Sequence, residues 1–309
     1  MSPRGGAAGL VVVGSLNGDY VIDVPRLPLL GDTVVGAGRP DIVFGGKGAN
    51  QAAAAASFGG TEAGVAMVGC VGDDELGHEM TAALSDLGVD VSGIRTVPGP
   101  SGRATIAVDP AGQNQILVDV GANAALRIAD VESDLVRDAV ALLVQLESPP
   151  DAVAAALRAT SGVRILNPAP ASGAAPLLAL ADIVVPNRTE LALLAGAGVA
   201  ETLPEVIEQV RSLRLAGAVV VTLGAEGALL VDASGEPQLV PGVDVDVVDT
   251  TGAGDCFCGV LAVELGRGRS LHDAVLAAVH AASLSVTGAG PRGRLPRPGD
   301  LVVTTDREV

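Results

Sequence analysis

The amino-acid sequence predicts an α/β protein, a three-layer sandwich in which helices cover both faces of a mostly parallel central sheet, with a small β-sheet lid. Short apolar runs of strand length alternate with stretches of helical length along most of the chain. The core must be built from Ala, Val and Leu, because 49% of the residues are hydrophobic while the chain has no Trp, one Tyr and three Phe. Such small aliphatic side chains suit parallel strands buried on both faces.

Apolar runs and glycines mark the individual elements. Residues 10–14 form an apolar run that ends in glycine, and the alanine-rich stretch 49–58 is closed by two glycines. Further strands are expected over residues 65–71, 141–145, 163–167, 183–186 and 218–223, and further helices over 75–87, 150–159, 203–215, 252–265 and 271–286.

Two segments break the alternation of strands and helices. Residues 18–44 contain alternating pieces at 20–24 and 33–43, and residues 102–120 contain two such pieces around a turn at 110–114. Both are typical of antiparallel hairpins with one polar face. We therefore expect an α/β core formed by residues 1–17, 45–101 and 121–309, and a β-sheet lid over a cleft formed by residues 18–44 and 102–120.

The charge of the chain limits its partners. The formal net charge of −17 excludes nucleic acid or an anionic membrane as the main partner, although a nucleotide can still bind at a local positive site. No apolar stretch approaches the roughly 20 residues of a membrane span. Three cysteines are too few for a disulfide framework, so we expect a cytoplasmic protein.

The most informative motif is Asp-Thr-Thr-Gly-Ala-Gly-Asp at residues 249–255, between an apolar run and a helix. The glycines Gly252 and Gly254 let the backbone approach a ligand and direct free N–H groups, including that of Ala253, at an anion. Asp255 in the first helical turn can then take a proton from an attacking hydroxyl. The alternative is an ordinary helix start, where an acidic residue is favourable.

Two further glycine-rich turns carry polar side chains. Gly45, Gly46, Lys47 and Asn50 open the helix at 49–58, and neither the first glycine nor the Ser or Thr of a Walker A loop is present. Asn17 and Asp19 follow the first strand, where ligands of open α/β sheets bind, and no dinucleotide fingerprint is present there. Both segments can recognise hydroxyl groups, and both can equally be plain turns.

Two segments after later strands complete the candidates. Asn187 and Glu190 would share one helical face and could bind Mg²⁺ through its waters, or could simply form a capping box. Thr222, Gly224 and Gly227 form a strand-to-glycine turn that could lie beneath a nucleotide.

Eight motifs in the same order make the sequence resemble the ribokinase (PfkB-type) carbohydrate kinase family over essentially the whole chain. They are Gly-Ser-Leu-Asn-Gly-Asp at 14–19, Gly-Gly-Lys-Gly-Ala-Asn-Gln-Ala at 45–52, Gly-Ala-Asn-Ala-Ala-Leu at 121–126, Gln-Leu-Glu-Ser at 145–148, Asn-Pro-Ala-Pro at 167–170, Pro-Asn-Arg-Thr-Glu at 186–190, Thr-Leu-Gly at 222–224 and Asp-Thr-Thr-Gly-Ala-Gly-Asp at 249–255. The resemblance implies a ribokinase-like sandwich whose core binds nucleotide and sugar. It also implies that ATP and Mg²⁺ are used to convert D-ribose into ribose 5-phosphate.

The resemblance also implies the roles of individual residues. Asp255 would be the general base at the 5-hydroxyl, with an anion hole over Gly252, Ala253, Gly254 and Asp255. Ribose would be held by Asn17, Asp19, Gly45, Gly46, Lys47, Asn50 and Glu147. The nucleotide would lie near Asn187, Thr222, Gly224, Gly227, Gly254 and His280, with Mg²⁺ ordered through water by Asn187 and Glu190. The lid would provide a homodimer interface.

A monovalent cation such as K⁺ is a further implication. Asp249, Thr251, Ser285 and Gly290 could supply its oxygens, yet Arg294 stands about where the family often has a small hydroxyl residue. A guanidinium cannot donate an oxygen ligand, so activation by K⁺ stays open. The arginine cluster at 292–297 is interpreted as a solvated loop.

Alternative functions stay open at this point. The chain could be a kinase of the same family for another pentose, a hexose or a nucleoside. It could also be a sugar-binding regulator without catalysis, although Asp255 and its glycines argue against that. The missing fingerprint excludes a Rossmann dehydrogenase in practice.

Overall fold

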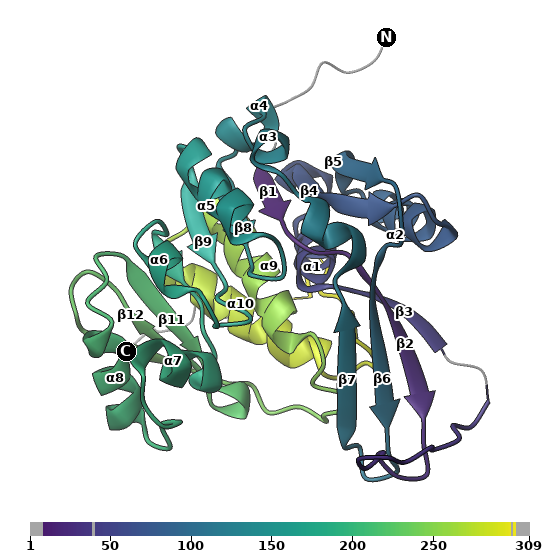
Figure 1. Ribbon diagram of the computed structural model, residues 1–309. Coiled ribbons are helices and arrows are strands. Elements are labelled where there is room, and N and C mark those ends of the chain that lie inside the picture. Colours follow the sequence, from purple (N-terminus) through teal and green to yellow (C-terminus); the bar gives the residue numbers. More distant parts are fainter. Residues whose placement is uncertain (1–8, 39–40, 298, 301–309) are drawn as a thin grey trace.

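A nine-stranded sheet forms the centre of the molecule, in the order β13-β12-β11-β10-β9-β8-β1-β4-β5 (Figure 1). The computed structural model describes residues 9–38, 41–297 and 299–300. The strands are β1 (Leu10–Val13), β4 (Val65–Gly72), β5 (Asp90–Val97), β8 (Ala141–Val144), β9 (Val163–Leu166), β10 (Ile183–Val184), β11 (Ala218–Thr222), β12 (Gly227–Val231) and β13 (Pro237–Pro241). All neighbouring pairs from β11 to β5 are parallel, and only β12 and β13 pair antiparallel at one edge.

Helices cover both faces of this sheet, so the three-layer prediction is confirmed. Successive residues of a strand point to opposite faces, and in β1 Val12 belongs to one core cluster while Val11 and Val13 belong to the other. One face is covered by α1 (Lys47–Gly59), α2 (Glu75–Asp86), α9 (Ala253–Gly266) and α10 (Leu271–Ser285). The other face is covered by α3 (Ile128–Val131), α4 (Asp134–Arg137), α5 (Pro150–Ala159), α6 (Ala175–Leu178), α7 (Arg188–Ala195) and α8 (Leu203–Ser212).

Small residues bring α1 and α9 into close contact. The buried alanines of α1 pack against α9, and a Cβ atom at Gly259 would lie 2.5 Å from the backbone oxygen of Gln51. Such a short separation leaves no room for any side chain at this position. The close packing places Asn50 and Gln51, in the first turns of α1, against Asp255 at the start of α9.

A second, four-stranded sheet has the order β3-β2-β6-β7 and extends to one side of the layered body (Figure 1). Its strands are β2 (Asn17–Asp23), β3 (Asp41–Gly45), β6 (Gly102–Val108) and β7 (Asn114–Asp119). The two predicted antiparallel hairpins are present, and β2 and β6 pair in parallel to join them into one sheet. The strand expected over residues 33–43 is shorter than predicted, because β3 begins only at Asp41 and the described residues before it form no strand.

The sequence missed β5, β12 and β13, which all lie toward the edges of the central sheet. β5 mixes polar and apolar residues because it is an edge strand, while β12 is completely buried but directly follows the glycine turn at residues 224–226. In the part of the chain that the structure describes, no helix has the length and apolarity needed to cross a membrane.

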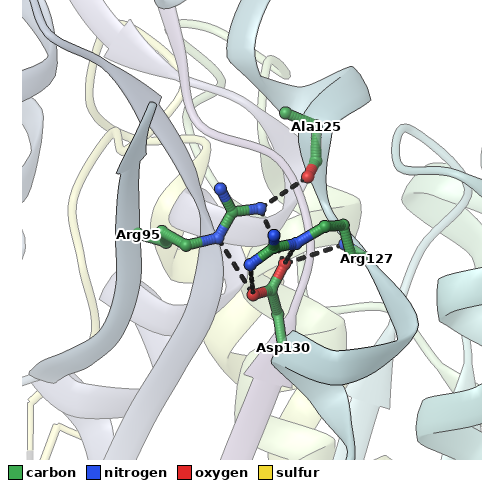
Figure 2. A network of polar contacts seen from close by, with 4 residues as sticks. All are labelled: Arg95, Ala125, Arg127 and Asp130. Carbon is green, nitrogen blue, oxygen red and sulfur yellow. Dashed lines mark hydrogen bonds and ion pairs between the residues drawn. The ribbon is translucent and has the colours of Figure 1, made fainter. Parts of the chain in front are cut away.

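An arginine–aspartate network fixes β5 to the segment before α5 (Figure 2). Arg95 donates to both oxygens of Asp130, at 2.9 and 2.7 Å, and to the carbonyl of Ala125 at 2.6 Å. Burial alone would raise the pKa of Asp130, but the hydrogen bonds from Arg95 and Arg127 hold that pKa well below its usual range. The network thereby anchors the short 3₁₀ helix η2 (Gly121–Ala125), which contributes to the site below.

Candidate active site

The candidate residues gather at the carboxyl ends of the central strands. The order in which strands join the sheet reverses at β1. The next strands of this sheet along the chain, β4 and β5, lie on one side of β1, and β8 and the later strands lie on the other. Ligands of open α/β sheets bind at such a switch point, outside the carboxyl ends of the strands. Here the segments that follow β1, β8, β9 and β10 supply Asn17, Glu147, Asn167 and Asn187, and Thr222 is the last residue of β11.

Three cavities lie next to one another at this edge. A central cavity of about 190 Å³ is lined by Lys47, Glu190 and Asp255, among others. It shares Lys47 and Glu190 with a larger cavity of about 680 Å³, which Asn17 and Glu147 also line. On its other side, the central cavity shares lining residues with a mostly apolar cavity of about 460 Å³. The arrangement therefore provides two ligand spaces that meet at one buried carboxyl group.

Asp255 is held at the centre by two amide side chains. The Nδ2 atom of Asn50 donates to Oδ2 at 3.1 Å, and the Nε2 atom of Gln51 donates to Oδ1 at 3.0 Å. Burial raises the pKa of Asp255, while Lys47 and the two amides oppose that rise. A buried carboxylate that is oriented by donors and lines a ligand cavity can act as a general base.

The backbone at the start of α9 gives this carboxyl group its position. Gly252 has φ 78°, and a Cβ atom there would overlap the carbonyl oxygen of Pro291. Gly254 has open space at its Cβ position and lines both the central and the apolar cavity. The N–H of Ala253 donates to the carbonyl of Thr250 at 3.3 Å, so the amides of Gly254 and Asp255 are those of the first turn that remain for an anion.

Lys47 lies among carboxylates between the central and the larger cavity. Burial alone would lower its pKa, but the negative charges of Asp255, Glu147 and Glu190 raise it above its ordinary value. The side chain therefore stays an ammonium group. Its backbone N–H donates to Oε2 of Glu147 at 3.0 Å, which links the start of α1 to the segment after β8.

The second sheet brings Asp19 to the same region. Gly45, which pairs with Asn17 in the register, leaves room for this carboxylate, because a Cβ atom on Gly45 would overlap Oδ2 of Asp19. Burial and the charge of Glu147 raise the pKa of Asp19 to about 6, although Arg292 opposes this rise. Gly46 has φ 85° and starts α1, where a side chain would contact the backbone of residues 15–17.

Asn123 is a site residue that sequence reasoning did not select. Its Oδ1 accepts the N–H of Leu16 at 2.9 Å, and its Nδ2 donates to the carbonyl of Leu16 at 3.1 Å and to Oδ1 of Asn17 at 2.7 Å. The oxygen of the Asn17 amide is thereby used, which leaves its NH₂ group for the cavity that both residues line. The only available signal was the motif at 121–126, which gives no role for its asparagine.

The apolar cavity receives most of the residues expected near a nucleotide. Thr222, Gly224 and Gly227 line it, together with Gly254. His280 does not line it and lies half-buried on α10, while its neighbours Val279 and Ser283 do line it. Val243, Val245 and Val247 also line this cavity and were not expected, because their segment has neither a motif nor a regular element.

Residues 7–298 match the profile of the pfkB family carbohydrate kinases. The chain belongs to this family. The ribokinase of Haemophilus influenzae is 38% identical over 295 residues, which cover 93% of this chain and 95% of that protein. The structure of Thermotoga maritima ribokinase has a TM-score of 0.85 and 34% identity and covers 93% and 96% of the two chains. The structure of Arabidopsis thaliana ribokinase, complexed with ribose and ATP, has a TM-score of 0.82 and 34% identity and covers 94% and 96%.

In this pfkB-family chain Asn187 and Glu190 form the capping box that the sequence offered as an alternative. Oδ1 of Asn187 accepts the N–H of Glu190 at 2.8 Å, and Oε2 of Glu190 accepts the N–H of Asn187 at 2.9 Å. Both residues also line the central cavity, and burial raises the pKa of Glu190. The carboxylate thus combines a capping contact with exposure to the ligand space.

The four residues considered for a monovalent cation come from three places: Asp249 and Thr251 precede α9, Ser285 ends α10, and Gly290 lies in the loop after it. The oxygens of Asp249 accept the N–H groups of Thr251 and Gly290, both at 2.9 Å. The hydroxyl of Ser285 donates to the carbonyl of Ala282, and its own carbonyl accepts the N–H of Arg294 at 3.2 Å. Each of these oxygens accepts one backbone N–H and keeps a further lone pair, so the set still has acceptors to offer a monovalent cation.

Proposed function

We propose that the protein is an ATP-dependent ribokinase that phosphorylates the 5-hydroxyl of D-ribose. The observation that carries this proposal is the position of Asp255, buried where the two larger cavities meet through a small central one. Membership of a carbohydrate kinase family and similarity to ribokinases along almost the whole chain support ribose and ATP as the two ligands.

In the proposed reaction Asp255 accepts the proton of the sugar 5-hydroxyl. The oxygen of that hydroxyl attacks the γ-phosphorus of ATP at the same time. The bond from that phosphorus to the oxygen bridging to the β-phosphate breaks, and ADP leaves. Phosphoryl transfer depends on positioning and on electrostatic stabilisation rather than on covalent chemistry by the protein. The ammonium of Lys47 and the free amides of Gly254 and Asp255 in the first turn of α9 are the groups available for the developing charge.

The sugar would occupy the larger cavity. Asn17, Lys47 and Glu147 line it, and Asp19, Gly45, Gly46 and Asn50 lie beside it through the contacts described above. A pentose carries several hydroxyl groups, each of which both donates and accepts, and this mixture of amides, carboxylates and one ammonium matches that need. The nucleotide would occupy the apolar cavity near Thr222, Gly224 and Gly227, because an adenine ring needs apolar walls.

Metal ions enter the proposal only through the nucleotide. Mg²⁺ would neutralise phosphate charge, and Glu190 with Asn187 would hold it through its waters, since Mg²⁺ keeps much of its hydration. The desolvated carboxylate of Glu190 in the central cavity suits a cation there. No step is routed through K⁺, for which Asp249 and its neighbours would supply oxygens.

The second sheet would act as the lid of the site and as a dimer interface. It contributes Asp19, and its edge strand β7 exposes Ile116 and Val118 on one face and Leu117 on the other. Apolar side chains exposed on an edge strand are suited to pairing with a second copy of the chain. We propose a cytoplasmic homodimer that is closed over ribose by this sheet.

A coupled ADP-release assay tests the proposed function directly. Purified protein with Mg²⁺ and ATP is offered ribose, 2-deoxyribose, fructose, glucose and a nucleoside, with and without K⁺. We expect kcat/KM to be highest for ribose, and the comparison with and without K⁺ decides whether a monovalent cation activates the protein. If another pentose, a hexose or a nucleoside reacts better than ribose, the ribose assignment is wrong. If nothing reacts but calorimetry detects sugar binding, the protein is a sugar-binding regulator.

The raised pKa of Asp19 predicts how sugar binding depends on pH. Below a pH of about 6 the carboxyl group becomes protonated and loses its anionic acceptor, so we expect KM for ribose to rise as the pH falls through 6. Steady-state kinetics between pH 5 and 8 measure this change. In Asp19→Asn the acid limb of 1/KM should disappear, whereas any limb of kcat itself should remain. An unchanged limb of 1/KM in Asp19→Asn would contradict the prediction.

A further inference from the structure

Arg292 lies in the loop that follows α10, and it does not face solvent as the sequence indicated. Its side chain is half-buried, whereas Arg294 and Arg297 in the same loop are exposed. Its Nε atom lies 3.4 Å from Oδ1 of Asn50. The segment beyond the last helix therefore reaches the first turn of α1, at the sugar end of the proposed site.

One nitrogen of this guanidinium lacks a partner. Nη2 of Arg292 is buried and has no hydrogen-bond partner among the described residues. A buried, unsatisfied donor on a charged group is costly, and a bound ligand, water or ion is one way to supply the missing acceptor. The charge of Asp19 also acts on this guanidinium: burial lowers the pKa of Arg292, and the attraction of Asp19 opposes this.

Arginine and aspartate offer complementary contacts to a sugar. A guanidinium has donors only, and an ionised carboxylate has acceptors only. A hydroxyl group both donates and accepts, so one hydroxyl or a neighbouring pair can satisfy both side chains at once. Asp19 lies on β2, two residues beyond Asn17, which lines the larger cavity. A positive and a negative group near that cavity are suited to reading a hydroxyl group.

We propose that Arg292 is a specificity-determining residue that donates through Nη2 to a ring hydroxyl of the sugar, which in turn donates to Asp19. This inference rests on the proposed function and adds one residue and one contact to it. The contact concerns a hydroxyl on the sugar ring and not the reacting 5-hydroxyl, which belongs to Asp255 at the central cavity.

Arg292 also links the sugar contact to the orientation of Asn50. The Nε atom of Arg292 donates to the Asn50 oxygen, which directs the Asn50 NH₂ group toward Asp255. A free amide could rotate by half a turn and present its oxygen to the Asp255 carboxylate, which would be repulsive. The loss of Arg292 should therefore raise KM strongly and lower kcat by only a few fold.

A cycle of variants and deoxy sugars tests the proposal. Wild type, Arg292→Ala, Arg292→Gln and the control Arg297→Gln are assayed with D-ribose, 2-deoxy-D-ribose and 3-deoxy-D-ribose. Arg297 is an exposed arginine of the same loop, so its variant removes the same charge without touching the site. Thermal unfolding shows which variants are folded, and Arg292→Gln remains informative if Arg292→Ala does not fold.

We expect the loss in kcat/KM caused by removing one sugar hydroxyl to depend on whether Arg292 is present. In wild type and Arg297→Gln, removing that hydroxyl should lower kcat/KM by about 10- to 100-fold, as for a polar contact whose partner is left unpaired. In the Arg292 variants the same removal should cost less than about 3-fold. If both deoxy sugars are penalised equally in wild type and in the Arg292 variants, the proposal is wrong.

The two proposals fail in different ways. A wild-type protein that phosphorylates ribose but shows no coupling contradicts the role of Arg292 alone. A wild-type protein that prefers another sugar contradicts the ribose assignment, and the same cycle with deoxy forms of the accepted sugar then decides the role of Arg292.

Discussion

Asp255→Asn should lower kcat by about 10²- to 10⁴-fold while sugar and nucleotide binding are largely kept, because an amide cannot accept the proton of the attacking hydroxyl. The substitution changes almost no volume, and its amide can still accept from one of the two donors that hold Asp255. In this variant Lys47 still has the carboxylates of Glu147 and Glu190 near it, so the positive charge of Lys47 should persist. Single-turnover kinetics measure the chemical step, and calorimetry with ribose measures binding.

The chain contains a matched control for this experiment. Asp273 is the third residue of α10, as Asp255 is the third residue of α9, so both have the same relation to a helix N-terminus. Asp273 is exposed and accepts a hydrogen bond from Ser270 at 2.7 Å. Asp273→Asn should leave kcat unchanged. Equal effects of the two variants, or near-normal kcat in Asp255→Asn, would leave Asp255 as an ordinary helix-start residue.

The sequence predicts the layered fold because the strands near its centre are buried on both faces. In β1 and β8 every residue is buried, so each reads as a short apolar run between glycines or polar residues. Edge strands such as β5 have one partner and partly exposed faces, so their pattern resembles that of a loop. The parallel pairing of β2 with β6 joins segments that are about 85 residues apart in the chain, and no local pattern encodes such a pairing.

Candidate site residues next to glycine turns could be predicted, since the turn itself signals a close approach of the backbone. Asn123 and Arg292 could not be predicted, because their importance comes from partners far away in the sequence. Asn123 acts on Asn17 and Arg292 acts on Asn50, over separations of 106 and 242 residues. An arginine in a loop rich in glycine and proline looks solvated until the fold brings a buried asparagine to it.

Gly252→Ala should reduce both stability and activity. Gly252 has φ 78°, and an alanine there costs about 1–2 kcal/mol of folding free energy from backbone strain alone. Its Cβ would also overlap the carbonyl oxygen of Pro291, which belongs to the loop that carries Arg292. Relief of that overlap must move the start of α9 or the loop, and either movement displaces Asp255 from Asn50 or Arg292 from its place. We expect a lower midpoint of urea unfolding and a fall in kcat/KM of about 100-fold or more, as for a misplacement of about 1 Å.

Gly254→Ala separates the loss of activity from the loss of stability. Gly254 lies two residues further along, where a Cβ atom meets nothing within 4 Å and α9 has already begun. Alanine is favoured over glycine within a helix by about 0.5–1 kcal/mol, so stability should be kept or should rise slightly. The new methyl group would stand in the space shared by the central and apolar cavities, so KM for ATP should rise. If Gly252→Ala is as stable as Gly254→Ala, the positive φ and the contact with Pro291 do not constrain the start of α9.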